Sequence, residues 1–190
     1  MRQAAEELHA KDAHYRRAMN ADFVIYLLVV VLIALSVRLF VGEPVLIEGQ
    51  SMYPTLHDGE RIVVEKLTYY AQEPARGDIV VCFYPGHTIS RVKRIVGLPG
   101  ERIAIRNGAV YIDGGLLDEG AYWNDIIFGD MEERIVPEGS VFVMGDNRNH
   151  STDSRDLGVG SIPYEKILGR AVLVFWPPDT ARTVRHAFSK

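Results

Sequence analysis

The sequence predicts a mainly β domain, with a coiled or barrel-like sheet, that follows one N-terminal transmembrane helix. Two observations lead to this fold class. Residues 23–41 form a long apolar run, and from Pro44 onward short apolar segments alternate with turn residues. Many short strands, several turns and few helical periods are typical of all-β domains.

The apolar run is long enough to cross a bilayer. Residues 23–37 carry no charge, and apolar residues resume after Arg38. At about 1.5 Å per residue the helix spans roughly 28 Å, close to the thickness of the hydrocarbon core. A buried helix and a cleaved secretion signal are the alternatives. A core helix is seldom apolar on every face over this length, and no A-x-A-like cleavage site follows the run.

Charges beside the run predict its orientation. Four basic residues precede it and acidic residues follow it. Because lysine and arginine favour the cytoplasmic side, residues 1–22 are expected to be a cytoplasmic tail. Residues 23–41 are then expected to be a membrane helix, and residues 42–190 an extracytoplasmic domain of a cell-membrane protein. Within that domain, about 101–140 is expected to form a smaller hairpin and loop excursion.

Alternating and continuous apolar segments locate the strands. The pattern indicates a strand near 45–50, a brief helical turn at 69–73, and further strands at 61–65, 79–84, 89–96, 103–106, 109–112, 141–144 and 171–176. Asn107-Gly108 is the strongest hairpin signal, because both central residues of a type I′ turn need positive φ. Residues 116–134 are polar and are expected to be a surface segment with little regular structure.

Composition excludes several classes of function. The net charge of −4 gives no general basic surface for nucleic acid. The one cysteine, Cys82, cannot form an internal disulfide and is expected to be buried. No H-E-x-x-H motif or cysteine cluster is present, so neither a metal site nor a cofactor is expected.

Ser51 and Lys93 are the candidate reactive residues. Ser51 lies where a predicted strand ends at Met52-Tyr53-Pro54, a turn that would hold its hydroxyl out from the sheet. A lysine can accept a serine proton only when neutral, and burial or a nearby cation lowers its pKa. Lys93 has apolar neighbours along its strand and Arg91 and Arg94 beside it. From local pattern alone, a turn serine and a row of solvated cations remain open alternatives.

A polar loop follows at 145–155. Asp153 and Arg155 are close enough in sequence to form an ion pair, and Ser151 or Ser154 could accept a hydrogen bond from a lysine amine. Asp146 and its neighbours are expected to shape the loop. His57 and His150 are the histidines closest to these serines in sequence, and they are the alternative bases.

With these motifs the chain resembles bacterial type I signal peptidases, which are membrane-anchored Ser/Lys peptidases. The resemblance covers about Val41 to Trp176. It rests on Ser51-Met52-Tyr53-Pro54-Thr55-Leu56, on Arg91 through Gly100, and on Gly145-Asp146-Asn147-Arg148 through Arg155. The single anchor and the compact segment after Gly100 are similar to the Gram-positive members.

The resemblance implies a role for each matched residue. Ser51 is the nucleophile, Lys93 is the general base and Ser151 orients Lys93. Asp153 and Arg155 support the loop, as does Asp146. The implied substrates are signal-peptide-bearing pre-proteins with small residues at the first and third positions before the cut, met at the membrane lipid surface. The implied substrate-binding residues are Val45, Ile47, Met52, Leu56 and Val92.

One position departs from the family pattern. Some members carry a serine two residues before the nucleophile, and its hydroxyl helps to hold the oxyanion; here the residue is Gly49. The Ser51 N–H can still donate, and the second donor would be a nearby backbone N–H or a water.

Three other functions share parts of this pattern. A self-cleaving repressor-type Ser/Lys protease has the same chemistry but carries a DNA-binding segment in place of an anchor. A dedicated peptidase for pilins or surface subunits would be hard to separate by sequence. A catalytically dead β scaffold that only binds exported chains is disfavoured by the presence of both Ser51 and Lys93.

Overall fold

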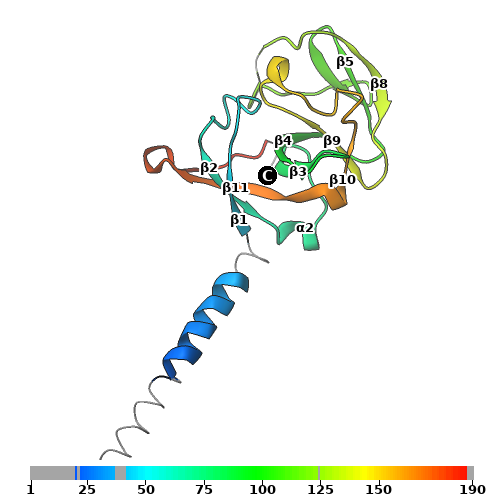
Figure 1. The fold of residues 1–190 in the computed structure, drawn as a ribbon. Helices are drawn as coiled ribbons and strands as arrows, with labels where there is room; N and C mark the ends of the chain where they lie inside the picture. The colour runs from blue at the N-terminus through cyan, green and yellow to red at the C-terminus, as the bar shows by residue number, and fades with distance from the viewer. Residues whose placement is uncertain (1–19, 21, 37–41, 124, 188–190) are drawn as a thin grey trace, which may run out of the picture. The chain divides into compact units, whose positions relative to one another are not determined.

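The computed structural model describes residues 20, 22–36, 42–123 and 125–187. The chain divides into two compact units, Met1–Val41 and Gly42–Lys190 (Figure 1). In the first unit residues 22–36 are helical, whereas 37–41, the end of the predicted membrane helix, and most of the predicted tail lie outside the described residues. Among the helices that are described, none is long and apolar enough to cross a membrane.

The second unit is mainly β and is built around a large antiparallel sheet. The strands follow the order β1-β2-β11-β3-β4-β9-β10, and β12 pairs with β11 at Leu173 and Val174. Their bounds are β1 Gly42–Leu46, β2 Arg61–Glu65, β3 Ile79–Phe83, β4 Ser90–Gly97, β9 Ser140–Met144, β10 Ile162–Pro163, β11 Ile167–Trp176 and β12 Arg182–Thr183.

The centre of the large sheet is buried on both faces. Along β3, Ile79 and Val81 belong to one core cluster, while Val80 and Cys82 belong to another. Since neighbouring residues of a strand point to opposite faces, a continuous apolar run such as this one indicates cover on both sides. Cys82 is fully buried, as predicted.

A second, smaller sheet has the order β7-β6-β5-β8. Its strands are β5 Arg102–Arg106, β6 Ala109–Ile112, β7 Gly115–Leu116 and β8 Met131–Ile135. The predicted Asn107-Gly108 hairpin is confirmed, with φ of 51° and 78° at these residues. Figure 1 shows β5 and β8 at the end of the domain remote from β1.

The expectation that 116–134 has little regular structure is confirmed for 117–123 and 125–130, which contain no helix or strand, but it is wrong for 131–134. Its last residues begin β8, which pairs with β5, and Ile127 is buried in the core beneath the small sheet. The polar sequence concealed the strand because β8 lies at the edge of the sheet, where Glu132 and Glu133 face solvent. Charged residues are common on edge strands, so the apolar alternation that identifies inner strands is missing.

Short helical turns complete the domain. They are α2 Thr68–Ala71, η2 Arg148–His150, η3 Tyr164–Lys166 and η4 Pro178–Thr180. The predicted turn at 69–73 corresponds to α2. The first strand begins and ends earlier than the predicted 45–50, because the chain leaves β1 after Leu46 and reaches a left-handed φ of 88° at Gly49.

Candidate active site

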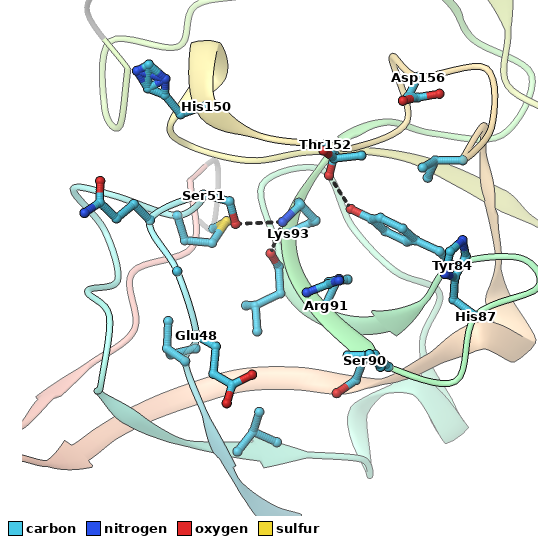
Figure 2. A pocket seen from close by; sticks show the side chains of 18 of the residues that line it. Glu48, Ser51, Tyr84, His87, Ser90, Arg91, Lys93, His150, Thr152 and Asp156 are labelled. Carbon is cyan, nitrogen blue, oxygen red and sulfur yellow. Dashed lines mark hydrogen bonds between the residues drawn. The ribbon is translucent and has the colours of Figure 1, made fainter.

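A pocket of about 570 Å³ lies between the segment that follows β1 and the first half of β4 (Figure 2). Both walls present unpaired backbone. Among the described strands, β1 pairs only with β2, and the edge of β4 opposite β3 begins to pair with β9 at Arg94. The pocket can therefore accept an extended peptide that adds a strand between the two walls.

Ser51 lies in the turn that follows β1, at the pocket wall. The turn is closed by hydrogen bonds from the Tyr53 N–H to the Gln50 carbonyl and from the Leu56 N–H to the Met52 carbonyl. The loop that follows β9 also holds it, because the Asn147 N–H donates to the Ser51 carbonyl at 3.0 Å. The Ser51 backbone is thus fixed from both sides.

Lys93 lies on β4 and is 3% exposed. Its Nζ donates to Ser51 Oγ at 2.8 Å and to the Val92 carbonyl at 2.9 Å, as the dashed lines in Figure 2 show. Burial lowers the pKa of Lys93 to about 8, an effect that Asp153 opposes and Arg91 reinforces. The structure therefore places a serine hydroxyl against an amine whose proton is easily lost.

Arg94, expected to act on Lys93 as a like charge, has a different role. Successive residues of a strand point to opposite faces, so Arg94 lies on the face of β4 opposite Lys93. There its guanidinium makes a two-bond ion pair with Asp146, with both distances 2.7 Å and both side chains almost fully buried. Thr55, in the serine loop, also donates to Asp146 at 2.5 Å. Asp146 therefore joins β4 to the serine loop.

Asp153 and Arg155 form the predicted ion pair at 2.8 Å. The other carboxylate oxygen of Asp153 accepts the Gly145 N–H at 2.9 Å, and Arg155 donates to the Arg148 carbonyl at 2.5 Å. The pair closes the 145–155 loop on itself beside Lys93.

Within the described residues, neither loop serine makes the expected hydrogen bond with Lys93. Ser154 Oγ accepts the Val143 N–H of β9, which commits it to the sheet. Ser151 Oγ is shielded from solvent and has no hydrogen-bond partner in the part of the chain that the structure describes. It lies against Gly145, where an added Cβ would be under 3.0 Å from both Ser151 Oγ and the Ser51 carbonyl. Ser151 is thus close to the site but is not bonded to Lys93.

Neither alternative base reaches Ser51. His57 is exposed, lies 3.6 Å from Glu60 and packs edge-on against Tyr53. His150 lines the pocket, but its Nδ1 is 3.1 Å from the Asn149 carbonyl, and Figure 2 shows its ring turned away from Lys93. The described residues contain no group of three or more acidic, histidine or cysteine side chains able to hold a metal.

Four of the five predicted substrate-binding residues line the pocket. These are Val45, Ile47, Met52 and Val92. Leu56 does not line the pocket: it is 1% exposed and belongs to the core cluster that also contains Ile47 and Met52, because the turn after Ser51 directs it inward. Leu56 could therefore affect substrate binding only by packing against Ile47 and Met52, which line the pocket.

The backbone near Gly49 provides one fewer free donor than the sequence suggested. The Gly49 N–H donates to Asp58 Oδ1 at 2.7 Å, so it is already used. The Ser51 N–H makes no hydrogen bond within the described residues and remains available to a substrate oxygen.

Three residues that contact Ser51 or the 145–155 loop were not predicted from the sequence. Gly145 allows the close approach described above, Thr55 bonds Asp146, and Glu119 pairs with Arg148. Thr55 and Gly145 lie within the motifs at 51–56 and 145–155, but Glu119 lies far from every motif, and its neighbours in sequence do not indicate a role at the site.

A serine hydroxyl in contact with a buried amine, at the wall of a pocket that can accept a strand, is one arrangement by which a serine peptidase can activate its nucleophile. Comparisons with known proteins identify the class more closely. Residues 20–176 match the family described as "Signal peptidase, peptidase S26".

Two similar proteins are Signal peptidase I T of Bacillus subtilis (strain 168) and Signal peptidase I of Bacillus amyloliquefaciens. The first is 40% identical over 168 residues, which are 84% of this chain and 86% of the relative. The second is 41% identical over 160 residues, which are 80% of this chain and 82% of the relative. A crystal structure of a signal peptidase I from Enterococcus faecalis V583 is 31% identical and covers 52% of this chain and 97% of its own, with a TM-score of 0.46.

The chain is therefore a serine peptidase, a hydrolase of peptide bonds. It belongs to the signal peptidase family, peptidase S26.

Proposed function

We propose that the protein is a membrane-anchored endopeptidase that removes signal peptides from exported pre-proteins, cutting after small residues with a Ser51/Lys93 dyad. The observation that carries this proposal is the 2.8 Å contact between the Lys93 amine and the Ser51 hydroxyl, with the lysine 3% exposed.

Burial makes Lys93 a usable base near neutral pH. With a pKa of about 8, about one amine in ten is neutral at pH 7. At the ordinary value of 10.5 the neutral fraction would be roughly 300-fold smaller. A base whose pKa lies near the working pH is the most effective one, because it is both unprotonated often enough and basic enough.

The reaction proceeds in two halves. Neutral Lys93 takes the Ser51 proton while Oγ attacks the scissile carbonyl, and the Ser51 N–H donates to the oxyanion. The protonated amine then gives its proton to the leaving nitrogen, which becomes the new N-terminus of the mature protein. The signal peptide remains as an ester on Ser51 Oγ. Water, deprotonated by the same amine, attacks the ester, releases the peptide and regenerates the hydroxyl.

The residues that line the pocket support the proposed preference for small residues. An added substrate strand would lie between β1 and β4, with alternate side chains directed to the same side. The first and third residues before the cut would then face Val45, Ile47, Met52 and Val92, the apolar side chains that line this part of the pocket. The second residue would point away from this wall, so its identity would matter less.

The 145–155 loop supports the dyad. Asp146 joins Arg94 to the serine loop, and the Asp153–Arg155 pair holds the loop closed beside Lys93. We assign Ser151 to orienting the lysine amine when it moves during the reaction. Its hydroxyl lies against Gly145, which also lies against the Ser51 carbonyl, and has no hydrogen-bond partner among the described residues.

Membrane anchoring is the remaining part of the proposal. Residues 22–36 are helical and almost entirely apolar, and the sequence stays apolar to Val41 except at Arg38. The charge distribution favours a cytoplasmic N-terminus and a catalytic domain on the far side of the membrane. The substrates would then be signal peptides already held in the lipid, so both reactants share one surface.

Cleavage of a model pre-protein with an A-x-A site tests the proposal. Wild type, Ser51→Ala and Lys93→Ala are compared as the full chain in detergent micelles, with His57→Ala and His150→Ala as matched controls. We expect both dyad variants to lose cleavage and both histidine variants to keep it. Full turnover by Lys93→Ala, or loss of turnover in a histidine variant, would refute the amine base. An inactive wild type would favour a binding scaffold.

A further inference from the structure

We propose that Glu119 and Tyr122, which lie outside the pocket, are positioning residues for the dyad. They fix the loop that follows β9 against Ser51. This inference rests on the proposed function, and it assigns a role to the 116–134 segment that joins the small sheet to the site.

Glu119 and Tyr122 form the centre of a buried charged cluster. Arg148 donates to both carboxylate oxygens of Glu119, at 2.6 and 2.7 Å, and the Tyr122 hydroxyl donates to the same carboxylate at 2.8 Å. The Tyr122 ring lies 4.2 Å from the Arg94 guanidinium and 5.6 Å from that of Arg148. Together with Asp146, which pairs with Arg94, the cluster contains two cations, two carboxylates and one aromatic ring.

The two guanidinium charges of the cluster are balanced by its two carboxylates, so the loss of one member leaves an opposite charge without its partner. Arg94 and Arg148 are among the largest fully buried side chains of the described residues. A buried ion pair that loses one partner leaves the other charge uncompensated, whereas an intact pair with all its hydrogen bonds holds a defined geometry. Aromatic faces attract guanidinium groups, so the Tyr122 ring adds a contact to both.

The cluster reaches the dyad by two routes. Arg148 Nε donates to the Gly145 carbonyl at 3.0 Å, which fixes the residue that lies against the Ser51 carbonyl and Ser151 Oγ. On the other side, Arg94 follows Lys93 directly on β4, and its partner Asp146 accepts the Thr55 hydroxyl of the serine loop. A shift of the cluster would move Ser51 and Lys93 relative to each other.

Their position also separates Glu119 and Tyr122 from the pocket in which the substrate is proposed to bind. Neither Glu119 nor Tyr122 lines the pocket, and both side chains are buried. Any effect of changing them must therefore act through the loop and through Arg94. Displacements of about 1 Å caused by distant substitutions can cost about 10²-fold in rate.

The test compares Glu119→Gln, Glu119→Asp and Tyr122→Leu with wild type, all as the full chain in detergent micelles. Glu133→Gln is the matched control, since Glu133 pairs with exposed arginines of the small sheet at 3.7 and 3.8 Å. A fluorescent serine-acylating reagent, run to completion, counts the reactive sites. Cleavage of the model pre-protein then gives kcat per reactive site and KM.

We expect Glu119→Gln and Tyr122→Leu to lower kcat per reactive site, by about 10²-fold for Glu119→Gln, with KM unchanged. Glu119→Asp should recover most of the loss because it restores the charge, and Glu133→Gln should match wild type. If a variant only has fewer reactive sites, each with wild-type kcat, the residues merely stabilise the fold and the inference is overturned. An unchanged kcat together with a raised KM would overturn it as well.

Failure of this inference is distinguishable from failure of the proposed function. If Ser51→Ala is inactive while Glu119→Gln keeps wild-type kcat, only the positioning role is lost. If Ser51→Ala remains active, the dyad itself is wrong.

Discussion

Replacing Lys93 by methionine should stabilise the protein at neutral pH while it abolishes cleavage. The pKa of Lys93 falls from 10.5 to about 8 on folding, mainly through burial. Each unit corresponds to about 1.4 kcal/mol, so holding the cation in the folded state costs about 3 kcal/mol. Methionine removes that cost but also removes the hydrogen bonds to Ser51 Oγ and the Val92 carbonyl, at about 1 kcal/mol each. The net gain at pH 7 is therefore about 1 kcal/mol.

The pH dependence is the sharper part of this prediction. Well below pH 8 the amine is protonated in both states, and the cost of the buried cation is then fully present. Between about 8 and 10.5 the folded protein has lost the proton while the unfolded chain keeps it, so the wild type gains stability as the pH rises. The free energy of unfolding of Lys93→Met relative to wild type should therefore fall by about 3 kcal/mol across this interval.

Urea unfolding followed by tryptophan fluorescence, at a series of pH values on the full chain in micelles, measures this difference. Lys93→Arg, which cannot lose its charge in this range, is the matched control and should be less stable than wild type throughout. A difference between Lys93→Met and wild type that does not change with pH would refute the argument, because it would mean that the amine titrates equally in both states.

Two further substitutions test the support of the site. Asp146→Asn should destabilise the protein by about 3–5 kcal/mol, because it leaves Arg94 buried and unpaired. Urea unfolding of the variant and of wild type measures the difference, and a loss below about 1 kcal/mol would mean that the pair is solvated. Gly145→Ala should lower the free energy of unfolding by about 1–3 kcal/mol, since its Cβ would collide with the Ser51 carbonyl and Ser151 Oγ. For the same reason it should lower kcat and change KM less. Thermal unfolding and cleavage kinetics measure both effects, and wild-type kcat in Gly145→Ala would contradict the close packing.

Much of the fold could be predicted because its signals are local. The continuous apolar run of β3, the Asn107-Gly108 turn and the alternation along β2 each reflect a property of a few adjacent residues. β8 could not be predicted in this way. Only Met131 of that strand is buried, and its partner β5 lies about thirty residues earlier in the sequence.

The active site likewise combines features that have local sequence signals with contacts that depend on residues distant in sequence. Ser51 and Lys93 were identified from a turn, a strand and the order of three motifs, and the fold brings them to 2.8 Å. The strand period would also have shown that Arg94 faces away from Lys93. In contrast, the contact between Glu119 and Arg148 joins residues that share no motif, so it follows only from the packing of the small sheet against the loop. Leu56 illustrates a smaller error, since a turn residue can point into the core as easily as into a pocket.

The pH dependence of kcat/KM for cleavage of a model pre-protein tests the central claim most directly, because it reports the ionisation of the free enzyme. With Lys93 as the base, kcat/KM should rise tenfold per pH unit below about 8 and level off above it, with the same profile in the His57→Ala and His150→Ala variants. A profile whose rise disappears when either histidine is removed would show that an imidazole removes the Ser51 proton, and the lysine-base mechanism would be wrong.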